Sequence, residues 1–169
     1  MGVLNMNKLT LSFTNSPITA TAVVIDGNLI VPKKDKSRTI YVYETEKQEV
    51  TLNIFSVHEF SGKFWWFFAF IYNLISVFGI FNPKYEKSGR VFDYKGVVTL
   101  NGDTQIKMSY PIAKVGNIAL KFFDNEYLNN ETNVYFTNEE IKKRAKAFKK
   151  IQIGTVIVAL LSVLAIIFL

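Results

Sequence analysis

The sequence contains no cysteine and a single histidine, His58. Without cysteine the chain has no disulfide, no thiolate metal ligand and no cysteine nucleophile, and one histidine cannot supply a multi-histidine metal centre. A glycine-rich phosphate loop, a Gly-x-Ser-x-Gly motif and a His-Glu-x-x-His motif are also missing. The neighbours His58 and Glu59 form the only histidine–carboxylate pair, but adjacent residues of a strand point to opposite faces. We therefore expect a polar position at a membrane boundary there, and a protein without catalytic residues, metal or cofactor.

Positive charge is unevenly distributed. The net charge is +6, and residues 138–150 hold six basic and two acidic residues. Nucleic-acid binding by this short stretch would need aromatic side chains for stacking, and Phe148 is the only one present. The basic stretch instead precedes an uncharged run, so lipid is the expected partner and nucleic acid is not.

That uncharged run, residues 151–169, reads IQIGTVIVALLSVLAIIFL. As a helix, 19 residues extend about 28 Å, close to the thickness of a bilayer core. A helix buried in a soluble core is the alternative, but apolar runs of this length are rare in soluble domains. The run predicts a C-terminal transmembrane anchor.

The residues before the anchor predict a basic juxtamembrane helix over 138–150. The series Thr137-Asn138-Glu139-Glu140 has the form of a capping box, in which the Thr137 hydroxyl caps the amide of Glu140. We expect one helix to run from here into the anchor. Six basic side chains should hold the preceding domain on the cytoplasmic side and attract anionic lipid. They are Lys142, Lys143, Arg144, Lys146, Lys149 and Lys150.

Most of residues 1–137 has the pattern of β-strands. Apolar and polar residues alternate between residues 8 and 57 and again between residues 90 and 136. Asp26-Gly27 and Asn101-Gly102-Asp103 are expected hairpin turns, the second joining a strand at 96–100 to its partner at 104–110. The charged series at 32–38 is an expected loop. Eight or nine strands predict a mainly β fold, an antiparallel β-sandwich.

Residues 23–57 resemble the PEGA-type β-sandwich repeat. The resemblance is carried by Val24-Ile25-Asp26-Gly27, by the strand Ile40-Tyr41-Val42-Tyr43, and by the closing run Val50-Thr51-Leu52. The family's Pro-Gly-Glu-His turn is replaced here by residues 44–48, and the resemblance covers about a fifth of the chain. It implies a small, non-catalytic module tethered to a membrane or outside the cytoplasm, and it implies no site residues.

An apolar aromatic insertion at 62–83 interrupts the strands. Residues 64–81 read FWWFFAFIYNLISVFGIF, without charge. Aromatic residues are typical of membrane interfaces, and the small or polar residues Ala69, Tyr72, Asn73, Ser76 and Gly79 share one arc of a helix. We favour an interfacial helix or a helical hairpin that dips into the membrane; a full span and a buried helix are the alternatives. The expected membrane-contacting residues are Phe64, Trp65, Trp66, Phe67, Phe68, Phe70, Phe78 and Phe81.

The sequence therefore predicts a membrane protein with three parts: a β-sandwich domain at 1–137, a juxtamembrane helix at 138–150 and an anchor at 151–169. Its expected role is to bind or scaffold protein partners, or a membrane complex, at the cytoplasmic membrane surface. One alternative is a two-span protein whose residues 82–150 form an outward-facing sensor or envelope domain. Another is a lipid-binding or membrane-perturbing protein.

Overall fold

The computed structural model describes residues 6–15, 20–35, 38–58, 60–77, 89–110, 118–123 and 126–168. The chain forms two compact units. The first comprises Met1–Val57 and Val91–Phe136, and the second comprises His58–Arg90 and Thr137–Leu169. The second unit is thus assembled from a segment between two strands and from the C-terminal region.

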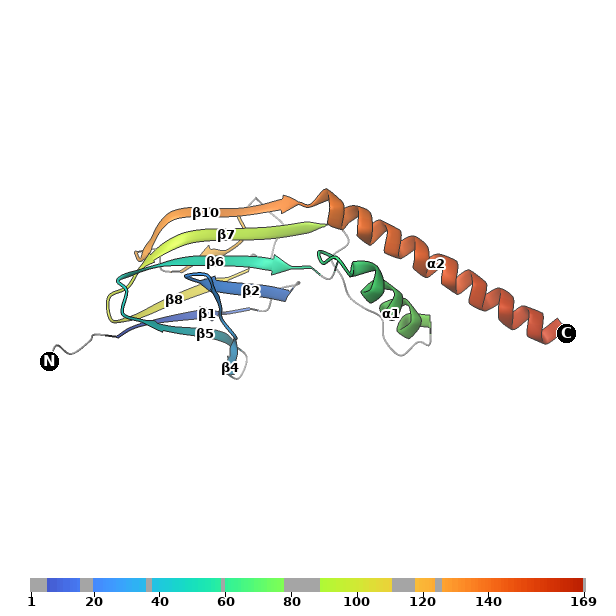
Figure 1. The fold of residues 1–169 in the computed structure, drawn as a ribbon, viewed down its shortest axis with the longest axis horizontal. Helices are drawn as coiled ribbons and strands as arrows, with labels where there is room; N and C mark the ends of the chain where they lie inside the picture. The colour runs from blue at the N-terminus through green and yellow to red at the C-terminus, as the bar shows by residue number, and fades with distance from the viewer. Residues whose placement is uncertain are drawn as a thin grey trace. The chain divides into compact units, whose positions relative to one another are not determined.

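The prediction of a mainly β chain is confirmed: ten strands form two five-stranded sheets in the described part of the chain (Figure 1). The first sheet has the order β4 (Lys33–Asp35), β5 (Arg38–Thr45), β1 (Asn7–Phe13), β8 (Asp103–Ser109) and β9 (Lys121–Phe122). The second has the order β10 (Leu128–Thr137), β7 (Arg90–Thr99), β6 (Glu49–Val57), β2 (Ala20–Ile25) and β3 (Asn28–Leu29).

The strand directions correct the expectation of a fully antiparallel fold. Pairs β1–β5, β4–β5, β8–β9, β2–β3, β2–β6 and β6–β7 are antiparallel, but β1 and β8 run parallel, with Leu11 beside Ile106. Parallel neighbours need a long connection. Between β1 and β8 the chain forms strands of both sheets, so this pairing is set by tertiary packing and leaves no local signal in the sequence.

The turn at Asn101-Gly102 also differs from the prediction. It does not close a hairpin, because β7 belongs to the second sheet and β8 to the first. Its backbone is held by β1 instead: the Gly102 amide donates to the Asn7 side chain (3.0 Å), and the Lys8 amide donates to the Gly102 carbonyl (3.1 Å). A turn motif predicts that the chain reverses, but not that the strands on either side pair.

The turn at Asp26-Gly27 joins β2 to β3 as predicted. Both residues have positive φ, 49° and 81°, which matches the twist of a two-residue hairpin. The loop expected at 32–38 is only partly a loop, because Lys33–Asp35 pairs with the start of β5. Its charge suits an edge strand, where charged side chains discourage pairing with another chain.

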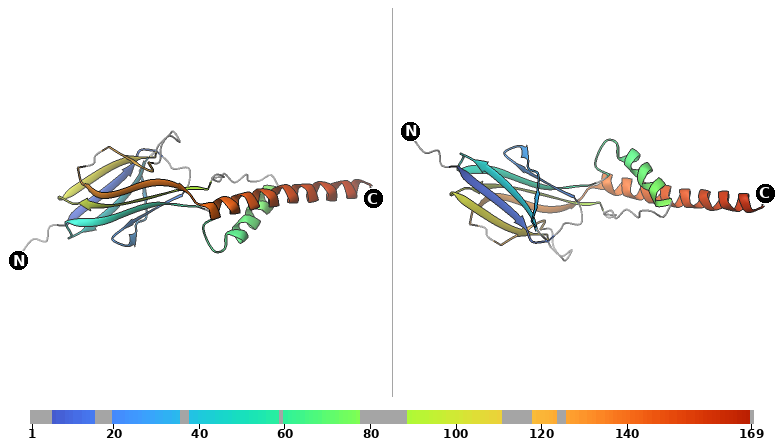
Figure 2. Two further views of the ribbon diagram at one scale, coloured as in Figure 1. Left: turned by 90° about the horizontal axis from the view of Figure 1, so that it is seen from above. Right: turned by 90° about the horizontal axis from the view of Figure 1, so that it is seen from below.

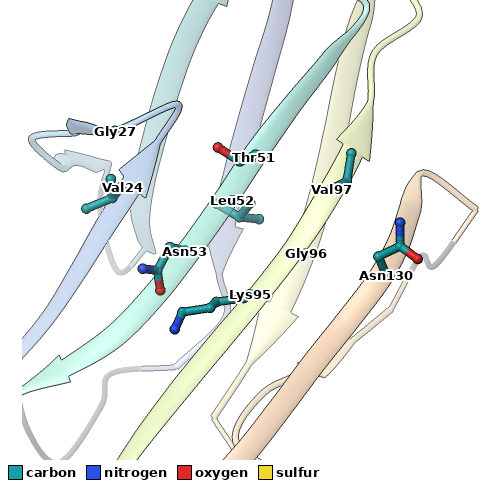
Figure 3. A pocket seen from close by; sticks show the side chains of 9 residues that line it. All are labelled: Val24, Gly27, Thr51, Leu52, Asn53, Lys95, Gly96, Val97 and Asn130. Carbon is teal, nitrogen blue, oxygen red and sulfur yellow. The ribbon is translucent and has the colours of Figure 1, made fainter.

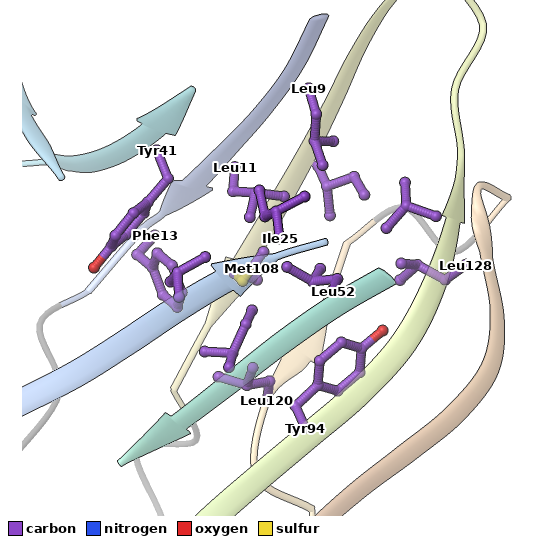
Figure 4. Packing of buried hydrophobic residues seen from close by; sticks show 14 of the residues in the cluster. Leu9, Leu11, Phe13, Ile25, Tyr41, Leu52, Tyr94, Met108, Leu120 and Leu128 are labelled. Carbon is purple, nitrogen blue, oxygen red and sulfur yellow. The ribbon is translucent and has the colours of Figure 1, made fainter. Parts of the chain in front are cut away.

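Apolar side chains of the two sheets form one buried cluster (Figure 4). Alternate residues of each strand contribute to it, as the burial of Leu9, Leu11 and Phe13 in β1 illustrates. From the other sheet come Leu52 and Tyr94, which are 1% and 0% exposed. Burying a side chain of this size stabilises the fold by about 1.5–3 kcal/mol.

The second unit contains two helices, α1 (Trp65–Val77) and α2 (Glu139–Phe168). At about 1.5 Å per residue they are about 20 and 45 Å long. The prediction of one continuous helix through the basic stretch and the anchor is confirmed. Helix α1 lies beside the first half of α2 in all three views (Figures 1 and 2).

The N-terminal cap of α2 is Asn138, and the prediction that Thr137 caps the helix is wrong. The Asn138 side-chain oxygen accepts hydrogen bonds from the amides of Glu140 and Ile141, both at 3.1 Å. Thr137 is the last residue of β10 and is therefore still extended. Asparagine and threonine are both good caps, so the sequence alone left the first residue ambiguous by one position.

Candidate functional site

Metal-ligating side chains are not gathered in the described part of the chain. No group of three or more His, Asp or Glu side chains there could hold a metal ion. His58 is 2% exposed and supports a turn: its Nδ1 accepts from the Phe60 amide at 3.2 Å, and its carbonyl accepts from Ser61. Glu59, which the sequence pairs with it, lies outside the described residues.

A shallow hollow of about 400 Å³ lies over β2, β6 and β7 (Figure 3). Its polar side chains include the cross-strand neighbours Asn53 and Lys95. The Lys95 ammonium is 3.0 Å from the Asp93 carboxylate, so its charge is already paired. The remaining lining is mostly apolar or backbone, and the hollow lacks the convergent polar groups that orient a ligand.

The six basic residues predicted before the anchor are divided by the structure into two groups. Lys143, Lys146, Lys149 and Lys150 are exposed. Lys142 and Arg144 are half-buried, and each pairs with a glutamate of the first turns, Lys142 with Glu139 at 2.9 Å and Arg144 with Glu140. Four exposed lysines in one stretch of helix are therefore available to attract anionic groups.

Arg144 also binds the chain that leads into α1. One of its terminal nitrogens donates to the carbonyl of Phe60 at 2.6 Å and lies 3.3 Å and 3.4 Å from those of Ser61 and Gly62. Arginine suits this position because its planar guanidinium presents five donors in a fixed geometry. The guanidinium carbon lies 5.6 Å from the centre of the Trp65 ring, a cation–π distance.

Helix α1 exposes most of its bulky residues. We define its aromatic face as five aromatic residues together with Leu74, which is 40% exposed. The aromatic residues are Phe64, which directly precedes the helix (67% exposed), Trp66 (60%), Phe67 (48%), Phe68 (51%) and Phe70 (55%). Trp65 is the exception among the predicted contact residues, since it is half-buried against Phe60. Phe78 and Phe81 lie outside the described residues.

The opposite face of α1 is small or polar and packs on α2. Ala69 and Asn73 are 1% and 5% exposed, and the Asn73 amide donates to the Thr155 hydroxyl at 2.6 Å. The hydroxyl in turn donates to the Ile151 carbonyl at 2.9 Å. On α2 the buried Ala145 and Phe148 belong to the same apolar cluster as Ala69.

Two features of this site were missed by sequence reasoning. Asn73 belongs to the predicted polar arc, but its partner Thr155 is a mild polar interruption of the anchor with no signal that joins the two. Arg144 was grouped with the lysines as a surface charge. The residue type could have indicated a separate role for Arg144, because it is the only arginine in a stretch of lysines.

The chain matches no protein-family model, and no match was found among curated proteins or solved structures.

Proposed function

We propose that this protein is a membrane-anchored, non-catalytic β-sandwich protein that binds or scaffolds protein partners at the membrane surface. The observation that carries the proposal is the exposure of α2. It is the only helix in the described ranges long and apolar enough to cross a membrane, and its most apolar window of 18 residues is not buried anywhere in the fold. Leu160 and Leu161 are 59% and 60% exposed. An apolar surface of this size marks contact with lipid or protein.

A binding role is supported by what the β-domain offers. Its two sheets share one apolar core, as the layers of a sandwich do. The hollow over β6 and β7 is apolar and shallow, which suits contact with a protein more than chemistry on a small molecule. The PEGA-type resemblance of residues 23–57 points to the same kind of module.

A cytoplasmic position for the β-domain is supported by Lys143, Lys146, Lys149 and Lys150. These exposed lysines come directly before the apolar part of α2, where basic residues favour the cytoplasmic side. The two-span alternative would place β6 and β7 on opposite sides of the membrane. Their pairing in one sheet, from Glu49 beside Thr99 to Phe55 beside Asp93, argues against that alternative.

Cysteine labelling tests the proposal, because the natural chain has no cysteine. Single variants Asn28→Cys and Gln105→Cys place an exposed thiol before and after α1 in sequence. In sealed cells neither should react with a membrane-impermeant maleimide, and both should react after permeabilisation. Labelling of Gln105→Cys alone in sealed cells would support the two-span protein and overturn this topology.

A fractionation experiment tests the anchor separately. The full chain should remain with membranes after alkaline carbonate extraction, since an inserted apolar helix is not released by loss of charge interactions. A chain that stops after Lys150 should be largely released. Release of the full chain would show that α2 is not inserted and would overturn the proposed function.

A further inference from the structure

The exposure pattern of α1 is the reverse of a helix on a soluble protein. A soluble surface helix buries its apolar stripe and exposes its polar side. Here Asn73 and Ala69 are buried, whereas Trp66, Phe68 and Phe70 are more than half exposed. This arrangement is stable only if the surroundings of the aromatic face are themselves apolar.

The two helices run in the same direction. Near the start of α1, the Trp65 ring lies beside Arg144, and the Phe60 ring lies 5.3 Å from that of Phe148. Further along, Asn73 is hydrogen-bonded to Thr155. Residues later in α1 therefore contact residues later in α2, so the two helices run parallel. Both helices begin at the level of the basic residues.

The segment that contains α1, residues 60–89, has both of its ends bound near the N-terminus of α2. The Gly89 carbonyl accepts a hydrogen bond from the Asn138 amide at 2.9 Å, at the first turn of α2. The carbonyls of Phe60 and Ser61 are bound by Arg144, less than two turns further along α2. Both ends of the segment are thus held at the N-terminal end of α2, and α1 extends away from that end.

The register with α2 sets the depth that α1 can reach. Thr155 follows Lys150, the last exposed lysine, by five residues, which corresponds to about 7.5 Å along a helix. Val77 ends α1 four residues beyond Asn73, so the helix ends at most about 14 Å past the lysines. The midplane of a hydrocarbon core about 30 Å thick lies at about 15 Å.

We propose that α1 is a half-membrane helix, which enters only the leaflet next to the β-domain and exposes its aromatic face to the acyl chains of that leaflet. The proposal rests on the proposed function, because it requires α2 to be inserted. Lipid is the occupant because the end of the aromatic face, at Leu74, lies level with the exposed apolar part of α2 through the adjacent Asn73–Thr155 contact, whereas its start lies level with the basic residues. The Asn73–Thr155 hydrogen bond gives each polar group a partner at a depth where water is absent.

Depth-dependent fluorescence quenching tests this proposal on the full chain in vesicles whose lipids carry bromine at defined acyl positions. Trp65 and Trp66 are the only tryptophans. Trp65→Phe leaves Trp66 as the probe, and adding Phe70→Trp or Leu74→Trp to a Trp65→Phe, Trp66→Phe background places the probe one and two turns further along α1. The most effective bromine should shift to deeper positions in the order 66, 70, 74, without reaching the chain ends.

The same vesicles provide a matched control and the outcomes that overturn the proposal. Trp66→Phe leaves the half-buried Trp65, which should be quenched less than Trp66. Equal and shallow quenching at 66, 70 and 74 would indicate a helix lying flat on the surface, and maximal quenching of 74 from the chain ends would indicate a full span. Absence of quenching in a protein that resists carbonate extraction would indicate burial against protein. Each of these three outcomes overturns the half-membrane helix and leaves the anchor standing.

A crosslinking experiment checks the register without moving a tryptophan. Cysteines at Asn73→Cys and Thr155→Cys should form a disulfide on mild oxidation in the membrane, because these side chains are in contact. The matched pair Leu74→Cys and Thr155→Cys should crosslink far less, since Leu74 belongs to the aromatic face. Equal crosslinking of the two pairs would contradict the packing of α1 on α2.

Discussion

The Tyr94 hydroxyl and the missing side chain of Gly96 compete for the same space in the core. The two residues are two apart on β7 and therefore share a face. A Cβ atom at position 96 would lie 2.6 Å from the Tyr94 hydroxyl. That hydroxyl is buried without a hydrogen-bond partner among the described residues, and burial raises its pKa. Position 96 therefore requires glycine, because any Cβ atom there would clash with the Tyr94 hydroxyl.

Substitutions at these two positions should be strongly coupled. Gly96→Ala overpacks the core and should lower the free energy of unfolding by about 1–3 kcal/mol. Tyr94→Phe removes an unpartnered polar group and should be neutral or stabilising. In the double variant the nearest atom to the alanine Cβ is a ring carbon, at 3.2 Å. Part of the unfolding free energy lost in Gly96→Ala should therefore be recovered. Urea unfolding in detergent, followed by circular dichroism, measures all three, and additive effects would contradict the clash.

Asp26 holds the β2–β3 turn to the neighbouring strand. Its carboxylate accepts from the Thr51 amide at 2.9 Å and from the Lys47 ammonium at 2.7 Å. The hydrogen bond from Lys47 is the main reason that the pKa of Asp26 lies below its ordinary value of 3.8, with Thr51 adding to it. The ionised form is therefore favoured in the folded protein.

This pKa shift makes part of the stability depend on pH. Because the folded pKa is lowered, the contribution is complete above about pH 4 and is lost as the pH falls through the folded value. Asp26→Asn should cost about 1 kcal/mol at neutral pH, and the difference from the natural protein should shrink in acid. Lys47→Gln should retain some of this dependence through Thr51. Unfolding curves between pH 2 and 7 check both, and a constant difference would contradict the prediction.

At the scale of elements, Gly89 allows the chain to approach the first turn of α2. Its φ is 68°, and a Cβ atom there would lie 2.8–2.9 Å from atoms of Asn138 and Lys142. Gly89→Ala should cost at least about 1–2 kcal/mol from backbone strain alone. Faster hydrogen exchange at the Asn138 amide, which donates to Gly89, would report the loss. The control Gly62→Ala meets no atom within 4 Å and should leave this amide unchanged.

The N-terminus of α2 offers a second prediction for an element. Asn138→Ala removes the acceptor of two helix amides and should cost about 0.5–2 kcal/mol of helix stability. Hydrogen exchange at Glu140 and Ile141 should become faster. Thr137→Val, at the position that the capping-box motif indicates, should leave both amides protected. Faster exchange in Thr137→Val, with unchanged exchange in Asn138→Ala, would identify Thr137 as the cap.

The strands and helices could largely be predicted from the sequence, but their partners could not. Alternation in residues 8–13 predicted β1, and the uncharged run predicted α2, because both signals are local. One neighbour of β8 is β1, about 95 residues earlier, and the Asn101-Gly102 turn resembles a hairpin although its strands lie in different sheets. Trp65 was predicted to contact the membrane and Arg144 to attract anionic lipid. Their mutual contact had no signal in the sequence, because it joins segments about 80 residues apart.

At the scale of the whole molecule, one insertion and one terminal helix together form the second unit. Strands β6 and β7 are neighbours in a sheet, so the insertion between them must leave and return at the same end of that pair. The hydrogen bonds of Arg144 and Asn138 hold both ends of the insertion to the start of α2. In the proposed topology, the orientation of α2 therefore sets the side of the membrane on which the β-domain and α1 lie.

The lysines before the anchor should control that orientation. Reversing Lys146, Lys149 and Lys150 to glutamate removes the positive charge nearest the membrane, so a fraction of molecules should insert with the β-domain outside. The measurement is labelling of Gln105→Cys by an impermeant maleimide in sealed cells. Reversing Lys33, Lys107 and Lys121, which are also exposed, makes the same change in net charge far from α2 in sequence. Because orientation depends on charge within about 15–20 residues of the span, this control should label no more than the Gln105→Cys variant with all its lysines intact. Equal labelling of the two charge-reversed variants would show that net charge, and not its position, sets the topology.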